Sequence, residues 1–245
     1  VFVAIALSMA VLLFWGAFFE TPRQVKEGQN NDQVVQQETL NQITPNISPE
    51  KISTKISRKD ALTKDDRVLI ENEKVIGSIS LQGAIFDDLS FKNYKTTLKS
   101  DDNVVFLNPK ETEDGYYIES GWTSVGNKIE VPGVDSIWKV RGNRVLTKNS
   151  EVNLEWNNGQ GLIFSKTISL DDKYLFKINQ QVKNNTSSEV NLYPYAQITR
   201  NKKPDDVMGF YILHEGFIGV FDGELKEDDY DDIKEKKIIK IADNG

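Results

Sequence analysis

The sequence predicts a mainly β protein, in which a large antiparallel β-sandwich follows one transmembrane helix and a polar linker. Three observations predict this order. Residues 1–19 carry no charged side chain. Residues 20–66 contain no Phe, Trp or Tyr. From Arg67 onward, aromatic residues appear together with an alternation of apolar and polar side chains, which is typical of strands.

The apolar segment Val1–Phe19 has the length of a transmembrane helix. At a rise of about 1.5 Å per residue it would extend about 28 Å, close to the thickness of a bilayer's hydrocarbon core. Trp15, Phe18 and Phe19 lie at its end, where aromatic rings suit the boundary between lipid and water. A cleaved signal peptide would end in small residues instead. We therefore expect an uncleaved anchor.

The segment 20–66 is predicted to be a flexible polar linker. It is rich in Gln, Asn, Thr, Ser and Lys, and it contains Pro22, Pro45 and Pro49. Its scattered Val and Ile residues keep no sustained period, so they cannot offset the entropy lost on ordering. Such a chain would let the following domain stand clear of the bilayer.

The third region, 67–245, is predicted to be the β domain. Four of its runs alternate apolar with polar residues: Val152–Trp156, Leu162–Leu170, Tyr174–Val182 and Val190–Ile198. Turn-forming pairs of Asn, Asp and Gly separate these runs, which predicts four successive strands in an antiparallel meander. Pro194 lies inside the last run, and this predicts an edge strand or a bulge there.

Further strands are predicted before and after this meander. The earlier candidates are Val75–Leu81, Ala84–Phe91, Val104–Leu107 and Tyr116–Trp122, with a tight turn at Asp114-Gly115. So many strands favour a sandwich of two sheets. Phe217–Phe221 is apolar on both faces, which predicts a covered strand. The charged segment Glu224–Lys237 fits either a short helix or a solvated hairpin.

Composition excludes several kinds of function. The net charge of −7 argues against a nucleic-acid partner, because phosphates need a basic face. The absence of cysteine excludes disulfides and thiol catalysis. His214 is the single histidine, and with Glu215 it could serve as an acid–base group. Neighbours in a strand point to opposite faces, however, so a structural role is the better interpretation. We expect no catalytic residue, metal site or cofactor, and no enzyme.

Two other patterns have plain structural explanations. The cluster Asp228, Asp229, Asp231 and Asp232 lacks the spacing of a calcium loop, which favours a solvated face. The tryptophans Trp122, Trp138 and Trp156 could stack on a sugar, yet tryptophans of a sandwich usually belong to its core. A membrane-anchored carbohydrate-binding or mutarotase-like periplasmic domain therefore stays open as the alternative function.

Three stretches resemble the Gram-negative YidC-type membrane protein insertases of the YidC/Oxa/Alb family. Val152–Phe164 resembles that family's L-x-W-x-N-G-Q-G-L-x-F run and leads into a segment similar to I-S-V-D-D-x-Y. Leu192–Arg200 resembles L-x-P-Y-x-x-I-x-R, and Phe210–Val220 matches F-x-I-L-H-E-G-x-I-G-V. The residues that carry the three motifs are Trp156, Gly159, Gln160, Gly161, Pro194, Tyr195, Arg200, His214, Glu215, Gly216 and Gly219.

The resemblance implies a periplasmic β-supersandwich similar in fold to sugar mutarotases. It also implies a chaperone-like insertase that helps inner-membrane proteins to insert and fold, alone or with the Sec translocon and its accessory subunits. Its partners would be nascent inner-membrane proteins and the lipid bilayer, and it would lie in the bacterial inner membrane. The family's C-terminal insertase bundle is expected to be absent from this chain, so no insertase residue is carried over. The motif residues are interpreted as fold determinants, with Gly159 and Gly161 in a tight turn, and with Gly216 and Gly219 at a turn or a close approach of the backbone.

Overall fold

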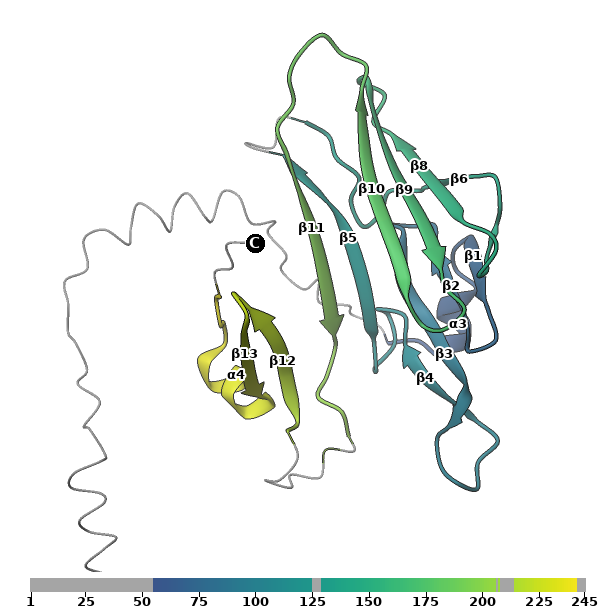
Figure 1. Ribbon diagram of the computed structural model, residues 1–245, viewed down its shortest axis with the longest axis vertical. Helices are drawn as coiled ribbons and strands as arrows, with labels where there is room; N and C mark the ends of the chain where they lie inside the picture. Colours follow the sequence, from purple (N-terminus) through teal and green to yellow (C-terminus); the bar gives the residue numbers. More distant parts are fainter. Residues whose placement is uncertain (1–54, 125–128, 206, 208–213, 242–245) are drawn as a thin grey trace, which may run out of the picture. The chain divides into compact units, whose positions relative to one another are not determined.

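The computed structural model describes residues 55–124, 129–205, 207 and 214–241 (Figure 1). The predicted transmembrane helix Val1–Phe19, with its interface residues Trp15, Phe18 and Phe19, lies outside these residues. Within the described ranges, no helix is long and apolar enough to cross a membrane. The described part is mainly β, which confirms the predicted fold class.

The strands form a seven-stranded sheet, a four-stranded sheet and a separate hairpin. The larger sheet has the order β11-β5-β3-β2-β1-β7, with β4 also paired to β3. Its strands are β1 (Arg67–Glu71), β2 (Val75–Ser80), β3 (Ile85–Lys95), β4 (Asn103–Leu107), β5 (Tyr116–Ser124), β7 (Val145–Leu146) and β11 (Leu192–Arg200). The smaller sheet has the order β10-β9-β8-β6. Its strands are β6 (Lys139–Arg141), β8 (Val152–Asn157), β9 (Leu162–Leu170) and β10 (Phe176–Asn184). Pairing is antiparallel except between β1 and β7, which are parallel over two residue pairs.

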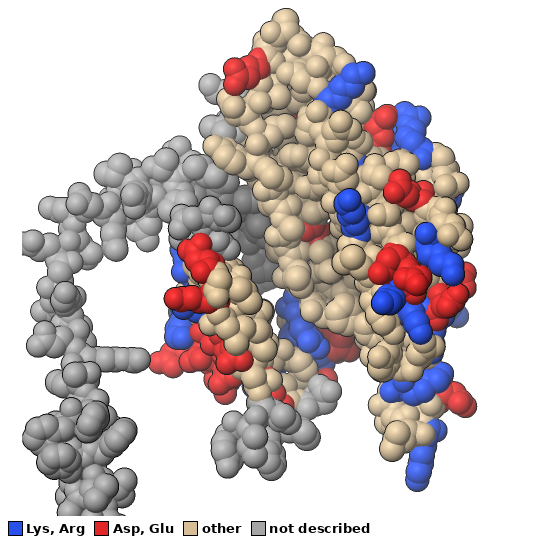
Figure 2. Space-filling view, viewed as in Figure 1, with Lys and Arg blue, Asp and Glu red and all other residues tan. Residues whose placement is uncertain are grey.

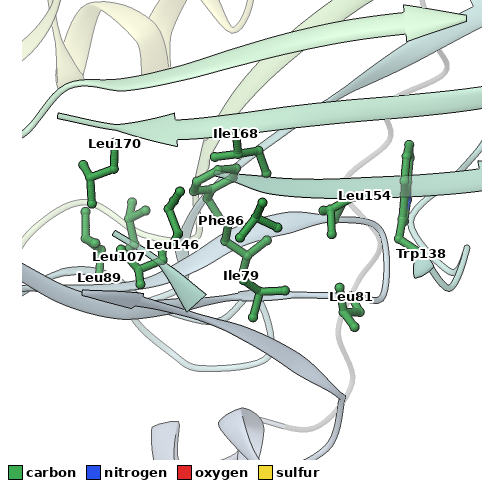
Figure 3. Packing of buried hydrophobic residues seen from close by; sticks show 14 of the residues in the cluster. Ile79, Leu81, Phe86, Leu89, Leu107, Trp138, Leu146, Leu154, Ile168 and Leu170 are labelled. Carbon is green, nitrogen blue, oxygen red and sulfur yellow. The ribbon is translucent and has the colours of Figure 1, made fainter. Parts of the chain in front are cut away.

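The core lies between the two sheets (Figure 3). Alternate side chains of β9 point into it, and Leu162, Phe164, Ile168 and Leu170 are buried as the period of two predicts. They meet residues of the larger sheet such as Trp122, whose ring centroid lies 5.1 Å from that of Phe164. The prediction that tryptophans belong to the core is confirmed for Trp122 and Trp138, which are buried, and Trp156 packs against the same cluster.

The predicted four-stranded meander is correct for β8, β9 and β10 but wrong for the fourth strand. β11 leaves this sheet and pairs with β5 of the larger sheet over nine residues, from Leu192 opposite Ser124 to Arg200 opposite Tyr116. The long register with β5 offers more cross-strand pairs than a short connection would predict. Because β11 ends the larger sheet, the predicted edge position of Pro194 is confirmed.

A short helix lies within the range predicted as linker. This helix, α3 (Arg58–Leu62), is capped by Ser57, whose Oγ accepts from the Asp60 backbone N–H at 3.1 Å. Ile56 N–H donates to the Glu111 carbonyl at 3.2 Å. Arg58 pairs with Asp88 of β3. The folded part therefore begins before Arg67, because polar contacts that the composition of the linker does not reveal fix α3 to the larger sheet.

The last described elements are a hairpin and a helix. β12 (Gly216–Phe221) pairs with β13 (Glu224–Asp229), and α4 (Tyr230–Lys236) follows, so the charged segment contains both a strand and a helix. The prediction of a covered strand at Phe217–Phe221 is wrong for the described structure, since Ile218 and Val220 are 60% and 64% exposed. The reason is that β12 has β13 as its strand partner and α4 meets it at Phe217, whose ring lies 5.8 Å from that of Tyr230.

Candidate functional site

The motif around Trp156 forms the hairpin between β8 and β9. The Asn158 side-chain oxygen accepts from the N–H groups of Gln160, at 2.8 Å, and Leu162, at 3.0 Å. Gly159 and Gly161 have φ values of +71° and +99°, which glycine adopts without strain, so the predicted tight turn is confirmed. At Gly161 an added Cβ would lie 2.6 Å from Thr186 Cγ2. These contacts make the motif a device for turning the chain.

The second motif lies on the edge strand β11. Tyr195 stands opposite Gly121 of β5 and covers it, since a Cβ at Gly121 would lie 3.0 Å from the tyrosine ring. Arg200 stacks over Tyr116, with its guanidinium carbon 4.9 Å from the ring centroid. Both residues thus fasten β11 to β5.

The third motif leads into the hairpin of β12 and β13. His214 Nε2 lies 3.2 Å from the Phe217 carbonyl, and its Nδ1 lies 3.4 Å from Asp229. The Glu215 carbonyl accepts from the Tyr230 N–H at 3.4 Å. A Cβ at Gly216 would lie 2.1 Å from the Asp228 carbonyl, which explains the glycine by close approach of the backbone. In the ranges that the structure describes, no group of three or more His, Cys, Asp and Glu residues could hold a metal ion.

A buried lysine, which the sequence reasoning missed, crosses the sandwich. Lys166 of β9 is 1% exposed, and its Nζ donates to the Ser120 carbonyl of β5 at 2.6 Å. The same ammonium lies 5.0 Å from the centre of the Trp138 ring. Burial lowers the pKa of Lys166 to about 8, and the charge of Glu119 opposes this effect. Its even position in the alternation of β9, between Phe164 and Ile168, is the signal that could have placed it in the core.

A second buried charge joins the strands of the larger sheet. Arg67 of β1 pairs with Asp87 of β3, and its Nε donates to Ser78 Oγ at 2.7 Å. Ser78 in turn donates to Asp88 at 2.6 Å, and Asp88 receives Arg58 from α3. Burial raises the pKa of Asp87 to about 6, against the opposing effect of Arg67. The network ties α3, β1, β2 and β3 together and faces no cavity.

The largest hollow lies where the sandwich ends at β10 and β11. A cavity of about 610 Å³ is lined by Phe86, Phe91, Tyr94, Ile118, Phe176 and Ile178, among others of the same apolar or aromatic kind. A second cavity of about 370 Å³ lies between β10 and β11 and includes Gln180 and Pro194. We call this region, with the two cavities and the inner faces of β10 and β11, the open side. Figure 2 shows that the surface over β10 and β11 carries few charged side chains in this view.

Comparison with known proteins gives a consistent result. Residues 67–245 match the family model of the YidC periplasmic domain. The chain is 44% identical to "Membrane protein insertase YidC" of Pelagibacter ubique, an alignment that covers 100% of this chain and 43% of the relative. It is 37% identical to the protein of the same name from Cereibacter sphaeroides, over 99% of this chain and 38% of the relative. A relative of that name from Sinorhizobium fredii is 38% identical, over 96% of this chain and 41% of its own length. The chain thus spans about two fifths of the length of these relatives.

Proposed function

Because this chain belongs to the YidC periplasmic domain family, we propose that it forms the anchor and the periplasmic domain of a membrane protein insertase. The single observation that carries the proposal is the family match over residues 67–245. Relatives named as insertases, aligned with nearly all of the chain, support it. The full-length protein would assist the insertion and folding of inner-membrane proteins.

The proposed arrangement places Val1–Phe19 across the inner membrane and the β domain in the periplasm. Residues 20–54 would join the two as a flexible polar linker. The complete domain would be a β-supersandwich of the mutarotase-like kind, to which the two described sheets contribute. The absence of any charge from Val1–Phe19 and the clustering of Trp15, Phe18 and Phe19 support this topology.

We propose that the domain acts by contact with other proteins and performs no covalent chemistry. Its two groups with the most strongly altered carboxyl and lysine pKa values, Asp87 and Lys166, are both buried and join strands to one another. The partners would be nascent inner-membrane proteins and the Sec translocon with its accessory subunits. The anchor would keep the domain close to both.

Depletion of the full-length protein in its own cell tests the insertase proposal. Protease accessibility of a newly made inner-membrane protein would report its insertion, and an exported soluble protein would serve as the control. We expect the membrane protein to remain protected on the cytoplasmic side until the full-length protein is restored. Normal insertion of every membrane protein tested, after depletion to background level, would contradict the proposal.

Topology can be tested separately, because the chain contains no cysteine. Lys177→Cys, at an exposed site on β10, should react in intact spheroplasts with a maleimide that cannot cross the membrane. A cysteine on a cytoplasmic protein provides the control for leakage. Labelling that requires lysis would place the domain on the other side of the membrane.

A further inference from the structure

Rows of apolar side chains on the inner faces of both sheets continue to the open side. In the smaller sheet, Val152, Ile168 and Ile178 stand side by side on β8, β9 and β10. The first two are completely buried, whereas Ile178 is 36% exposed. A sheet buries its apolar face only where another layer covers it. The covering layer therefore ends before β10.

The larger sheet behaves in the same way. Phe86 of β3 pairs with Ile118 of β5, which pairs with Ile198 of β11. Exposure rises along this row, from 8% at Phe86 to 67% at Ile198. Since β10 and β11 are the terminal strands of their sheets, both inner faces lose their cover on the same side of the sandwich.

One polar atom on the open side also lacks its expected contact. The Gln180 side-chain oxygen is buried, and no hydrogen-bond donor reaches it from the described residues. Gln180 stands opposite Lys166 on the inner face of β10 and lines the cavity of about 370 Å³. A buried acceptor of this kind is normally satisfied, so a donor is missing at this place.

We propose that an apolar segment of the same polypeptide, from the part of the full-length protein that follows Gly245, closes the open side. This segment would place apolar side chains in the cavity of about 610 Å³ and a hydrogen-bond donor beside Gln180. The proposal goes beyond the insertase function, since it concerns how the domain is completed.

The length of chain outside the structure favours this occupant. The matched region is 43% of the Pelagibacter relative and 38% of the Cereibacter relative, so more than half of each relative lies elsewhere. An open apolar interior beside two unpaired strand edges would aggregate if it were covered only from time to time. A segment of the same chain is held there at high effective concentration, which a diffusing partner is not.

Cysteine labelling of the purified full-length protein tests the proposal. Ile178→Cys and Ile198→Cys report the two inner faces, in a background without other cysteines. Asn179→Cys is the matched control, because Asn179 is the next residue of β10 and is exposed on the outward face. Unfolding in urea should make all three cysteines react alike with a maleimide, which controls for intrinsic reactivity.

If the same chain closes the open side, both inner cysteines react at least about tenfold more slowly than the control, because labelling then needs local opening. Equal rates for either inner cysteine and the control would overturn the proposal. Slow reaction in membranes that becomes fast after purification would also overturn it, since a separate partner would then be the cover. Insertase activity is not part of this measurement, so its outcome is independent of the proposed function.

Discussion

Replacing Lys166 by methionine should change how the stability of the domain depends on pH. Methionine has a similar length and carries no charge, so the substitution removes the buried ammonium with a small change in volume. Burial holds the pKa of Lys166 at about 8 in the folded chain, against 10.5 for the model value. The unfolded chain therefore binds one more proton between these two values.

The sign and size of the effect follow from this difference. A base with a lowered pKa destabilises the folded state below pH 8, and this cost is lost as the pH rises from 8 towards 10.5. Between pH 7 and pH 9 the wild type should gain about 1 kcal/mol relative to Lys166→Met. This gain is independent of any packing defect, because a packing defect acts equally at both pH values.

Urea denaturation followed by tryptophan fluorescence measures the effect, since Trp122 and Trp138 lie in the core. The difference in unfolding free energy between wild type and Lys166→Met is compared at pH 7 and pH 9. Lys177→Met, at an exposed position of the neighbouring strand β10, is the control and should show no such change. A difference that stays constant between the two pH values for Lys166→Met would refute the assignment of a buried, charged lysine.

Three other substitutions test neighbouring conclusions by the same urea method. Asp87→Asn should remove a contribution of opposite sign: the folded pKa of about 6 exceeds 3.8, so the wild type should gain about 1 kcal/mol relative to the variant from pH 7 to pH 5. An identical gap at both pH values would argue against it. Gly161→Ala should cost about 1–3 kcal/mol, because its φ of +99° suits glycine. Gly133→Ala, with no atom within 4 Å of the added Cβ, should change little; equal effects of the two would exclude backbone strain. Asn158→Ala should cost about 1–3 kcal/mol by leaving two buried or half-buried N–H groups without their acceptor, and an unchanged urea midpoint would disprove that role.

The sequence predicts the strands of this domain better than it predicts their partners. Alternation in Leu162–Leu170 and the glycines of the following and preceding turns locate β9 and its hairpin correctly. A period of two says which face of a strand is buried, but it does not say which strand lies beside it. For this reason β11 was expected beside β10, although it crosses to β5.

Buried charges were missed for a related reason. Lys166 and Asp87 look like ordinary surface residues in composition, and their burial follows from partners far away in the sequence, Ser120 for one and Arg67 for the other. The parity of Lys166 within β9 was visible in the sequence, whereas nothing near Asp87 announced Arg67. Similarly, α3 owes its position to Asp88, thirty residues later, which no reading of the polar linker could supply.

The attachment of α3 has a mechanical consequence. The chain before Ser57 would join the domain to a membrane anchor, so any tension in that segment reaches the domain at α3. Ile56 is bonded to Glu111 and Arg58 to Asp88, and β3, which carries Asp88, pairs with β2, β4 and β5. A pull is therefore shared among several strands of the larger sheet before it reaches β1. Without these contacts the same force would act on β1 alone and would peel it from β2 one residue pair at a time.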